Sequence, residues 1–265
     1  MSVKTVVYAL LLGVLASSCV PTKEMIYLQP GEGETTEVFS YQREEYKLQV
    51  NDILDVQIRS MNQEVNQMFG SGNMMNQQMQ AGVQSGGDLY YMTGYTVDEK
   101  GEVELPYLGS VKVQGLSLEE AKAAINTQVS TLFKSFYLQV KLGGIRYSAI
   151  GEFQSPGKKV ILQNQATIFE AIAASGDLTQ VAKRDEIKLI RQYPDGTRIH
   201  TLNLLDQSII SSPYYFIQPN DVVYAEPLPQ KAWGIGVTGA QTFTTIISTL
   251  STSLALTLSI ISLTR

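Results

Sequence analysis

The sequence predicts an α+β chain of two small mixed modules in series, followed by a C-terminal membrane-spanning helix. Between residues 44 and 228, short runs of alternating apolar and polar residues are interleaved with two capped helical segments. Glycine, proline and asparagine separate these runs. No charged side chain occurs from residue 232 to residue 264, although 17% of the chain is charged. Such an uncharged stretch is typical of a membrane segment.

Composition excludes several classes of function. The chain has 265 residues, 44% of them hydrophobic, and a formal net charge of -5 without long acidic runs. Nucleic-acid binding depends on basic patches, so no nucleic acid is expected. Cys19 is the single cysteine and His200 the single histidine, so one chain can form neither a disulfide framework nor a Cys/His zinc site. We predict no metal and no cofactor.

The N-terminus has the pattern of a lipoprotein signal peptide over residues 1–18. Lys4 gives a basic start, residues 6–15 are apolar, and small residues end at Ser18, directly before Cys19. This pattern predicts cleavage between Ser18 and Cys19 and acylation of the Cys19 thiol. A triacylated cysteine would anchor the chain stably in a membrane. The alternative is an incidental cysteine beside an ordinary cleavage site.

The C-terminal region, residues 229–265, is predicted to be a linker and a transmembrane segment at about 239–263. As a helix, this segment would be roughly 36 Å long, enough for a hydrocarbon core of about 30 Å. On a 3.6-residue period the candidate lipid-facing residues form one stripe: Phe243, Ile246, Ile247, Leu250, Leu254, Leu258 and Ile261. The candidate pore-facing residues lie opposite: Gln241, Thr245, Ser248, Thr252 and Ser259.

This amphipathic pattern favours an oligomer. A lone spanning helix has little use for a hydroxyl-lined face, whereas a ring of identical helices can turn such faces inward around a wet pore. Two alternatives remain. In residues 253–260, small or polar side chains alternate with large apolar ones, which is also the pattern of a strand in a membrane β-barrel. Serine and threonine can also bond back to the preceding helical turn, which would suit a plain anchor or a buried docking helix.

The first predicted module covers residues 44–143. A short strand pattern at 53–58 follows a polar turn. Ser117 and Glu120 form a capping box that predicts the start of a helix. A second strand pattern follows at 136–142. Before this module, the Pro- and Gly-containing residues 19–43 indicate a tether.

Within the first module, residues 61–93 are rich in Met, Asn and Gln and have no sustained period. We predict a long, mobile insertion here. Scattered methionines in such a loop do not predict a metal site.

The second predicted module covers residues 144–228. Thr167 and Glu170 cap a short helix, and residues 187–204 form a hairpin around a turn at Asp195 and Gly196. Further strand patterns lie at 148–152, 159–162 and 214–227.

The centre of the first module resembles the polysaccharide biosynthesis/export domain. The matching positions are Asp98, Gly101, Leu105, Pro106, Leu108, Gly109, Gly115, Leu116, Ser117, Glu120 and Ala121. The second module resembles the soluble-ligand-binding β-grasp (SLBB) domain through Gly151, Glu152, Pro156, Gly157, Thr167, Glu170, Ala171, Gly176, Pro219, Asp221 and Val222. With the lipoprotein signal before these modules and the apolar segment after them, the chain resembles the outer-membrane polysaccharide export (OPX) lipoproteins.

The resemblance implies a non-enzymatic, porin-like subunit of a translocation pore for capsular or exopolysaccharide. It implies a homo-oligomeric ring, a lipid anchor in the cell outer membrane, and soluble modules in the periplasm. The expected partners are the polysaccharide in transit and an inner-membrane co-polymerase, often linked to a tyrosine kinase. The alternative is a lipid-anchored periplasmic ligand- or glycan-binding protein, which can act as a monomer.

Two departures from the family pattern affect the expected structure. Asn51 and Asn220 stand where the family has the glycine of a Gly-Asp turn. Asparagine tolerates left-handed backbone best after glycine, so we expect both turns to be kept. A single β-grasp copy is evident, which predicts a shorter periplasmic chamber.

No catalytic constellation is predicted. Residues 234–239 read GIGVTG, but an uncharged apolar segment follows instead of a βαβ unit with an acidic residue. Asp52 with Asp55, or Asp185 with Glu186, offers the two carboxylates of a glycosidase pair, yet no nucleophile or base accompanies either pair. A polysaccharide-processing enzyme is therefore the least favoured function.

Overall fold

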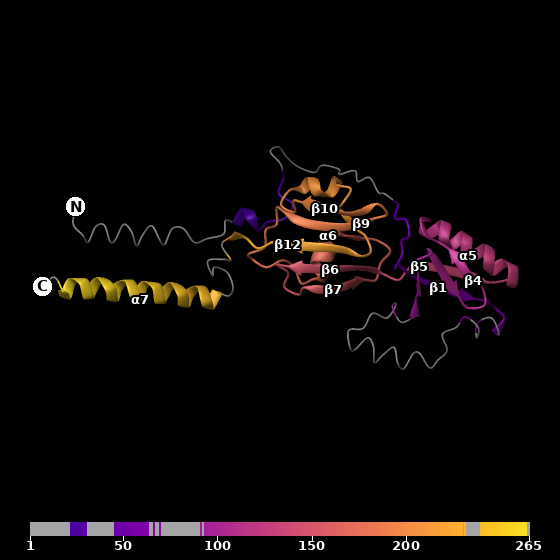
Figure 1. The fold of residues 1–265 in the computed structure, drawn as a ribbon, viewed down its shortest axis with the longest axis horizontal. Helices are drawn as coiled ribbons and strands as arrows, with labels where there is room; N and C mark the ends of the chain where they lie inside the picture. Colours follow the sequence, from indigo (N-terminus) through magenta and orange to yellow (C-terminus); the bar gives the residue numbers. More distant parts are fainter. Residues whose placement is uncertain are drawn as a thin grey trace.

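The computed structural model describes residues 22–30, 45–63, 66, 69, 91, 93–229, 231 and 239–263. Within the last range it describes the side chains of residues 244–257 and 259–262. The chain has a mixed α+β fold with four sheets and a C-terminal helix, as the sequence predicts (Figure 1).

The first group of strands forms a three-stranded antiparallel sheet in the order β2-β1-β5. Its strands are β1 (Ile53–Arg59), β2 (Tyr95–Thr96) and β5 (Tyr137–Leu142). Beside it lie the hairpin of β3 (Glu102–Leu105) and β4 (Gly109–Lys112), and the helix α5 (Leu118–Leu132). The capping box predicted for α5 is present, and Ala121, Ile125 and Val129 are buried on the predicted apolar face.

The second group is a five-stranded sheet in the order β10-β9-β12-β6-β7. Its strands are β6 (Ile145–Gly151), β7 (Gly157–Ile161), β9 (Ile187–Tyr193), β10 (Gly196–Leu202) and β12 (Asp221–Ala225). Strands β6 and β12 run parallel, and the other neighbours are antiparallel. The helix α6 (Ile168–Ala174) begins at the predicted Thr167 capping box, next to the short pair β8 (Ala166–Thr167) and β11 (Phe216–Ile217).

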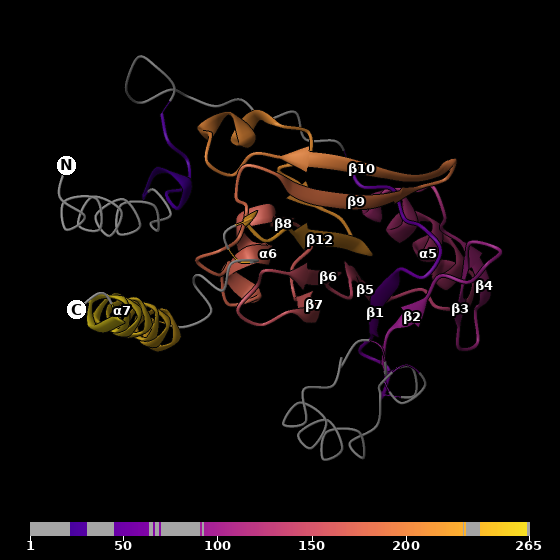
Figure 2. The ribbon, with the colours of Figure 1, turned by 60° about the vertical axis from the view of Figure 1, so that its left-hand side comes forward.

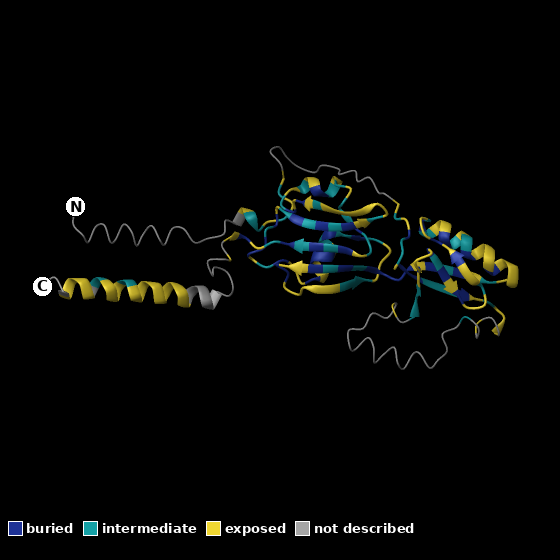
Figure 3. Ribbon diagram, viewed as in Figure 1, coloured by how far each residue is buried: buried dark blue, intermediate teal, exposed yellow. Residues whose placement is uncertain are grey.

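One hydrophobic cluster runs through both groups of strands. Buried residues concentrate on the strands and on the inner faces of α5 and α6 (Figure 3). The two sheets are joined through β5 and β6, which are separated by only two residues, Gly143 and Gly144. This short connection holds the sheets close together and brings the ends of β5 and β6 to the same junction.

Part of the predicted tether is docked on the second sheet. The short 3₁₀ helix η1 (Thr22–Glu24) precedes a segment in which Leu28 donates its backbone N–H to the Leu204 carbonyl at 3.1 Å. Tyr27 Oη donates to Asp177 Oδ1 at 2.6 Å, and the Arg184 guanidinium lies 5.4 Å from the Tyr27 ring centroid. Contacts outside the local sequence therefore fix residues 26–29. The predicted signal peptide, Ser18 and Cys19 lie outside the described residues, as does most of the 61–93 insertion.

The two Asn-Asp turns have the predicted left-handed conformation. Asn51 has φ +71° and Asn220 has φ +66°. In each turn the following aspartate accepts a hydrogen bond from the backbone N–H three residues earlier: Asp52 from Gln49 at 2.8 Å, and Asp221 from Gln218 at 2.7 Å. The expectation that asparagine preserves both turns is confirmed.

These turns give a stability prediction. Replacing Asn51 with alanine should lower the free energy of unfolding by about 1 kcal/mol, because a Cβ without a compensating polar group is strained at positive φ. Replacing Asn51 with glycine should be nearly neutral. Urea unfolding of the two variants, and of the same pair at Asn220, measures the difference. Equal losses for alanine and glycine would contradict a backbone origin.

Candidate functional site

The C-terminal helix α7 (Gly239–Leu263) is the first candidate functional element. It is helical across residues 253–260, so the barrel-strand alternative is wrong for this segment. Among the described residues, Thr244–Ser262 is the one stretch of helix whose length and apolar composition suit a membrane crossing, and none of it is buried. In Figures 1 and 2 the helix stands clear of both sheets.

Most of the described hydroxyls of α7 are hydrogen-bonded to the helix itself. Ser248 Oγ donates to the Thr245 carbonyl at 2.9 Å, and Thr252 Oγ1 donates to the Ser248 carbonyl at 2.8 Å. Because the Ser248 and Thr252 donors are satisfied internally, this part of the predicted pore-facing surface is compatible with either water or a lipid environment. The hydroxyl pattern alone therefore does not establish a pore.

The predicted apolar stripe is exposed wherever its side chains are described. Exposed members are Ile246, Ile247, Leu250, Leu254 and Ile261. The side chains of Gln241, Phe243 and Leu258 lie outside the described residues, and Ser259 is exposed. Leu256 and Ile260 are also exposed, at 64% and 53%, although the stripe does not include them. The apolar surface is therefore wider near the C-terminal end than predicted.

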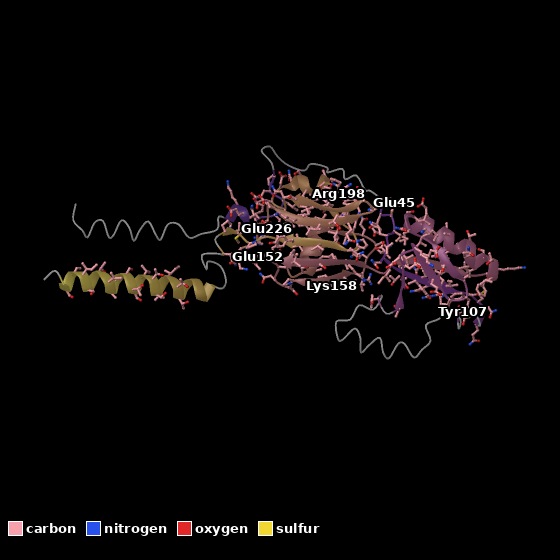
Figure 4. The ribbon with its side chains drawn as sticks, in the orientation of Figure 1. Glu45, Tyr107, Glu152, Lys158, Arg198 and Glu226 are labelled. Carbon is pink, nitrogen blue, oxygen red and sulfur yellow. The ribbon has the colours of Figure 1, made fainter. Side chains whose placement is uncertain are left out.

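A cleft of about 490 Å³ between the two groups of strands is the second candidate site. One wall comes from the segment before β1 and the start of α5, and the other from the loops before β8 and β12. Figure 4 labels Glu45 at this junction. Its lining residues include Glu45, Tyr46, Leu118, Glu119, Asn164, Gln165, Pro213, Phe216 and Gln218. Sequence reasoning missed this cleft.

Asp52 is hydrogen-bonded to Tyr46, a lining residue of the cleft, and is 2% exposed. Its Oδ2 accepts hydrogen bonds from Tyr46 Oη at 2.6 Å and from the Gln49 backbone N–H at 2.8 Å. Its Oδ1 has no hydrogen-bond partner among the described residues. Burial raises the pKa of Asp52 to about 6, against the hydrogen bonds, which lower it. Burial and the neighbouring Asp52 charge also raise the pKa of Tyr46.

The raised pKa predicts a pH-dependent stability. Between about pH 4 and pH 6 the folded state binds more protons at Asp52 than the unfolded state does, so stability falls as the pH rises through this window. The loss is on the order of 2–3 kcal/mol. Thermal unfolding at pH 4, 5, 6 and 7 should show a smaller decrease for Asp52→Asn than for the wild type. The same pH slope in both proteins would exclude Asp52 as its source.

The second wall is held by a buried ion pair. Arg191 Nε and Nη2 donate to the two carboxylate oxygens of Asp221 at 3.0 and 2.7 Å, and both side chains are buried. Arg191 Nη2 also donates to the Phe216 carbonyl at 3.0 Å. This pair therefore fixes the segment 216–221, which lines the cleft. The sequence signal available was the repeated Gln-x-Asn-Asp pattern at 49–52 and 218–221.

The other titratable residues considered from sequence occupy structural positions. His200 Nε2 lies 3.0 Å from Tyr193 Oη, and its ring stacks on Tyr214 with centroids 3.8 Å apart. Burial lowers the pKa of His200. Asp55 lies in β1 and accepts from Gln57 Nε2 at 3.1 Å. No group of three or more His, Cys, Asp or Glu side chains suited to a metal occurs in the described part of the chain.

Comparisons with known proteins agree on one family. Residues 40–143 match the family model described as polysaccharide biosynthesis/export protein. The chain is 26% identical over 141 residues to the EPS I polysaccharide export outer membrane protein EpsA of Ralstonia nicotianae. It is also 26% identical over 138 residues to the protein of the same name from Ralstonia solanacearum.

Each alignment covers 51% of this chain and 36% of the relative, so the chain matches about a third of the length of these proteins. The matched region contains the first group of strands, α5, and the Asn51 turn at the cleft. The family model and both relatives therefore agree with the resemblance carried by residues 97–121. Residues 40–143 therefore resemble a polysaccharide biosynthesis/export domain, and the chain is similar to outer-membrane polysaccharide export proteins.

Proposed function

We propose that this protein is a subunit of an oligomeric outer-membrane pore that exports capsular or exopolysaccharide. The match of residues 40–143 to the polysaccharide biosynthesis/export family carries this proposal. It is supported by α7, which is long and apolar enough to cross a membrane. The protein's contribution is positional, since it forms a conduit and changes no bond in the polymer.

The proposed organisation has two periplasmic modules. Residues 44–143 form the export domain, and residues 144–228 form an SLBB β-grasp domain. The second assignment is supported by the five-stranded mixed sheet with its parallel β6–β12 pair and by α6. Cys19 carries the lipid anchor, and residues 229–265 contain the linker and the membrane helix.

The export step requires a wide, polar and weakly binding channel. One helix cannot enclose such a channel, so the proposal requires a ring of subunits. In that ring Thr245, Ser248 and Thr252 face the lumen, and the apolar stripe from Ile246 to Ile261 faces lipid. Because the hydroxyl donors already bond to the helix, the hydroxyl oxygens offer acceptor sites without fixed charge, which suits weak contacts with sugar.

Oligomeric state tests this proposal. The mass of the detergent-extracted mature protein, measured by light scattering with detergent subtracted, should correspond to a large closed oligomer. A chain ending at Lys231 should fall apart into smaller species. A matched control replaces α7 with a leucine helix of the same 25-residue length, which keeps a membrane anchor but removes the hydroxyl face. A monomer both with and without α7 would contradict the pore.

The second candidate function is a lipid-anchored periplasmic protein that binds a ligand or glycan as a monomer. The cleft of about 490 Å³ favours this alternative, because a pore subunit does not require a pocket of that size.

The inner-membrane co-polymerase, with or without a tyrosine kinase, stays a predicted partner of the pore.

A further inference from the structure

The cleft between the two groups of strands has the volume of a small-ligand site. Its volume of about 490 Å³ lies within the range of about 300–1,000 Å³ that is typical of such sites. Its two walls come from separate segments of the chain, and Tyr46 on one side is 172 positions from Gln218 on the other. It is therefore a concave surface formed between structural elements.

Polar side chains in the cleft are available for hydrogen bonds. The lining includes the amides of Asn164, Gln165 and Gln218. Asn164 Oδ1 accepts from the Leu142 backbone N–H at 3.3 Å. The side-chain amides of Gln165 and Gln218 have no hydrogen bond to any described residue. Each amide offers two donors and an acceptor, a combination that matches the hydroxyl groups of a sugar.

Apolar surface alternates with these amides. Tyr46, Phe216, Pro213 and Leu118 line the cleft. A sugar ring carries hydroxyl groups at its edge and C–H groups on its faces, so it fits a site that combines aromatic or apolar surface with a few polar groups. A purely apolar ligand would leave the amides unsatisfied, at a cost for each buried polar group.

The charge of the cleft restricts the kind of sugar. Among the described lining residues, Glu45 and Glu119 are the charged ones, and both are acidic. Their nearest cations, Lys47 at 3.5 Å from Glu45 and Lys122 at 4.0 Å from Glu119, belong to exposed pairs and are not among the lining residues. A uronic acid or phosphorylated sugar would find no cation among these lining residues to pair with, whereas a neutral hydroxyl can donate to either carboxylate.

The walls are held in place before any ligand arrives. The Asn51 turn is fixed by hydrogen bonds to Asp52, and the Asn220 turn by the buried Arg191–Asp221 pair. Gln218 precedes this second turn by two residues, and its backbone N–H is bonded to Asp221. A site on rigid turns loses little conformational freedom when it binds.

The geometry points to this cleft as a binding site for uncharged sugar residues of the exported polysaccharide. This inference rests on the proposed function and specifies its substrate. The cleft contacts the polymer outside the membrane and discriminates against anionic sugars. Binding at each subunit is weak, and a ring of subunits presents several copies of the site to one chain.

The test uses the full-length protein in detergent and oligosaccharides released by mild acid hydrolysis of the host cell's own surface polysaccharide. Anion-exchange chromatography separates these probes into uncharged and acidic fractions. Saturation-transfer NMR titration should show binding of the uncharged fraction and none of the acidic fraction. The double variant Gln165→Leu/Gln218→Leu should weaken this binding about tenfold, as expected for two lost hydrogen bonds.

Gln192→Leu is the matched control, because Gln192 is exposed on β9 and does not line the cleft. It should leave binding unchanged. The inference is overturned if neither fraction binds, if the acidic fraction binds better, or if the double variant binds as well as the control. It is also overturned if the double variant dissociates the oligomer without weakening sugar binding, which would identify the cleft as a subunit interface.

The same samples separate this inference from the pore proposal. An oligomer that does not bind the uncharged fraction contradicts the sugar site and leaves the pore intact. A monomer that binds the fraction through the cleft contradicts the pore and supports a glycan-binding protein.

Discussion

Replacing Arg191 with methionine is expected to lower the free energy of unfolding by about 3–5 kcal/mol, because it leaves Asp221 buried without its counter-ion. Asp221 is 1% exposed and would retain the Gln218 N–H as its hydrogen-bond donor, at 2.7 Å. The Phe216 carbonyl would also lose its Arg191 donor. The variant should therefore loosen the wall of the cleft as well as the fold.

Guanidinium chloride unfolding followed by circular dichroism measures this loss. The control is the double variant Arg191→Met/Asp221→Leu, which removes both charges and should recover a large part of the stability. If the double variant is as unstable as the single one, the loss comes from packing and not from the unpaired carboxylate.

Replacing Gly151 with alanine is expected to cost about 2–5 kcal/mol, the combined effect of a left-handed backbone and steric overlap. Gly151 ends β6 with φ +87°, and an added Cβ would lie 2.0 Å from the Ala225 carbonyl oxygen. That carbonyl accepts the Glu152 backbone N–H at 3.0 Å. The parallel pairing of β6 with β12 would have to shift to accommodate the methyl group.

Gly157→Ala is the matched control for Gly151→Ala. Gly157 also has positive φ, +132°, but an added Cβ would meet no atom within 4 Å. The free energy of unfolding should fall less in Gly157→Ala than in Gly151→Ala, because the alanine at position 157 causes backbone strain but no steric overlap. The same unfolding measurement applies to both variants. Equal losses would show that steric contact with Ala225 is not the cause.

Features set by short stretches of sequence were predicted well. Ser117 with Glu120, and Thr167 with Glu170, form the two capping boxes expected from their spacing. The hairpin of β9 and β10 turns between Tyr193 and Gly196, within the predicted range. Both asparagine turns have positive φ. Each feature depends on residues a few positions apart, so its physical cause is contained in the local sequence.

Sequence patterns also revealed the similarity to polysaccharide export proteins, because the motif between residues 97 and 121 is long and specific. They were less informative about α7. The 3.6-residue and two-residue periods coincide over residues 253–260, and the helical conformation was decided only in the structure. The exposed Leu256 and Ile260 show that the stripe describes the helix surface incompletely.

The sequence by itself determined the α+β class, the helix starts, the left-handed turns and the similarity to polysaccharide export proteins. Only the tertiary structure decided the cleft, the Arg191–Asp221 pair and the docking of Tyr27 beside Asp177 and Arg184. The residues that these features bring together are far apart in the sequence. Arg191 and Asp221 are 30 positions apart, and Tyr27 is 150 positions from Asp177. Their partners are selected by the packing of whole sheets and by the burial of charge, which no local period or motif specifies.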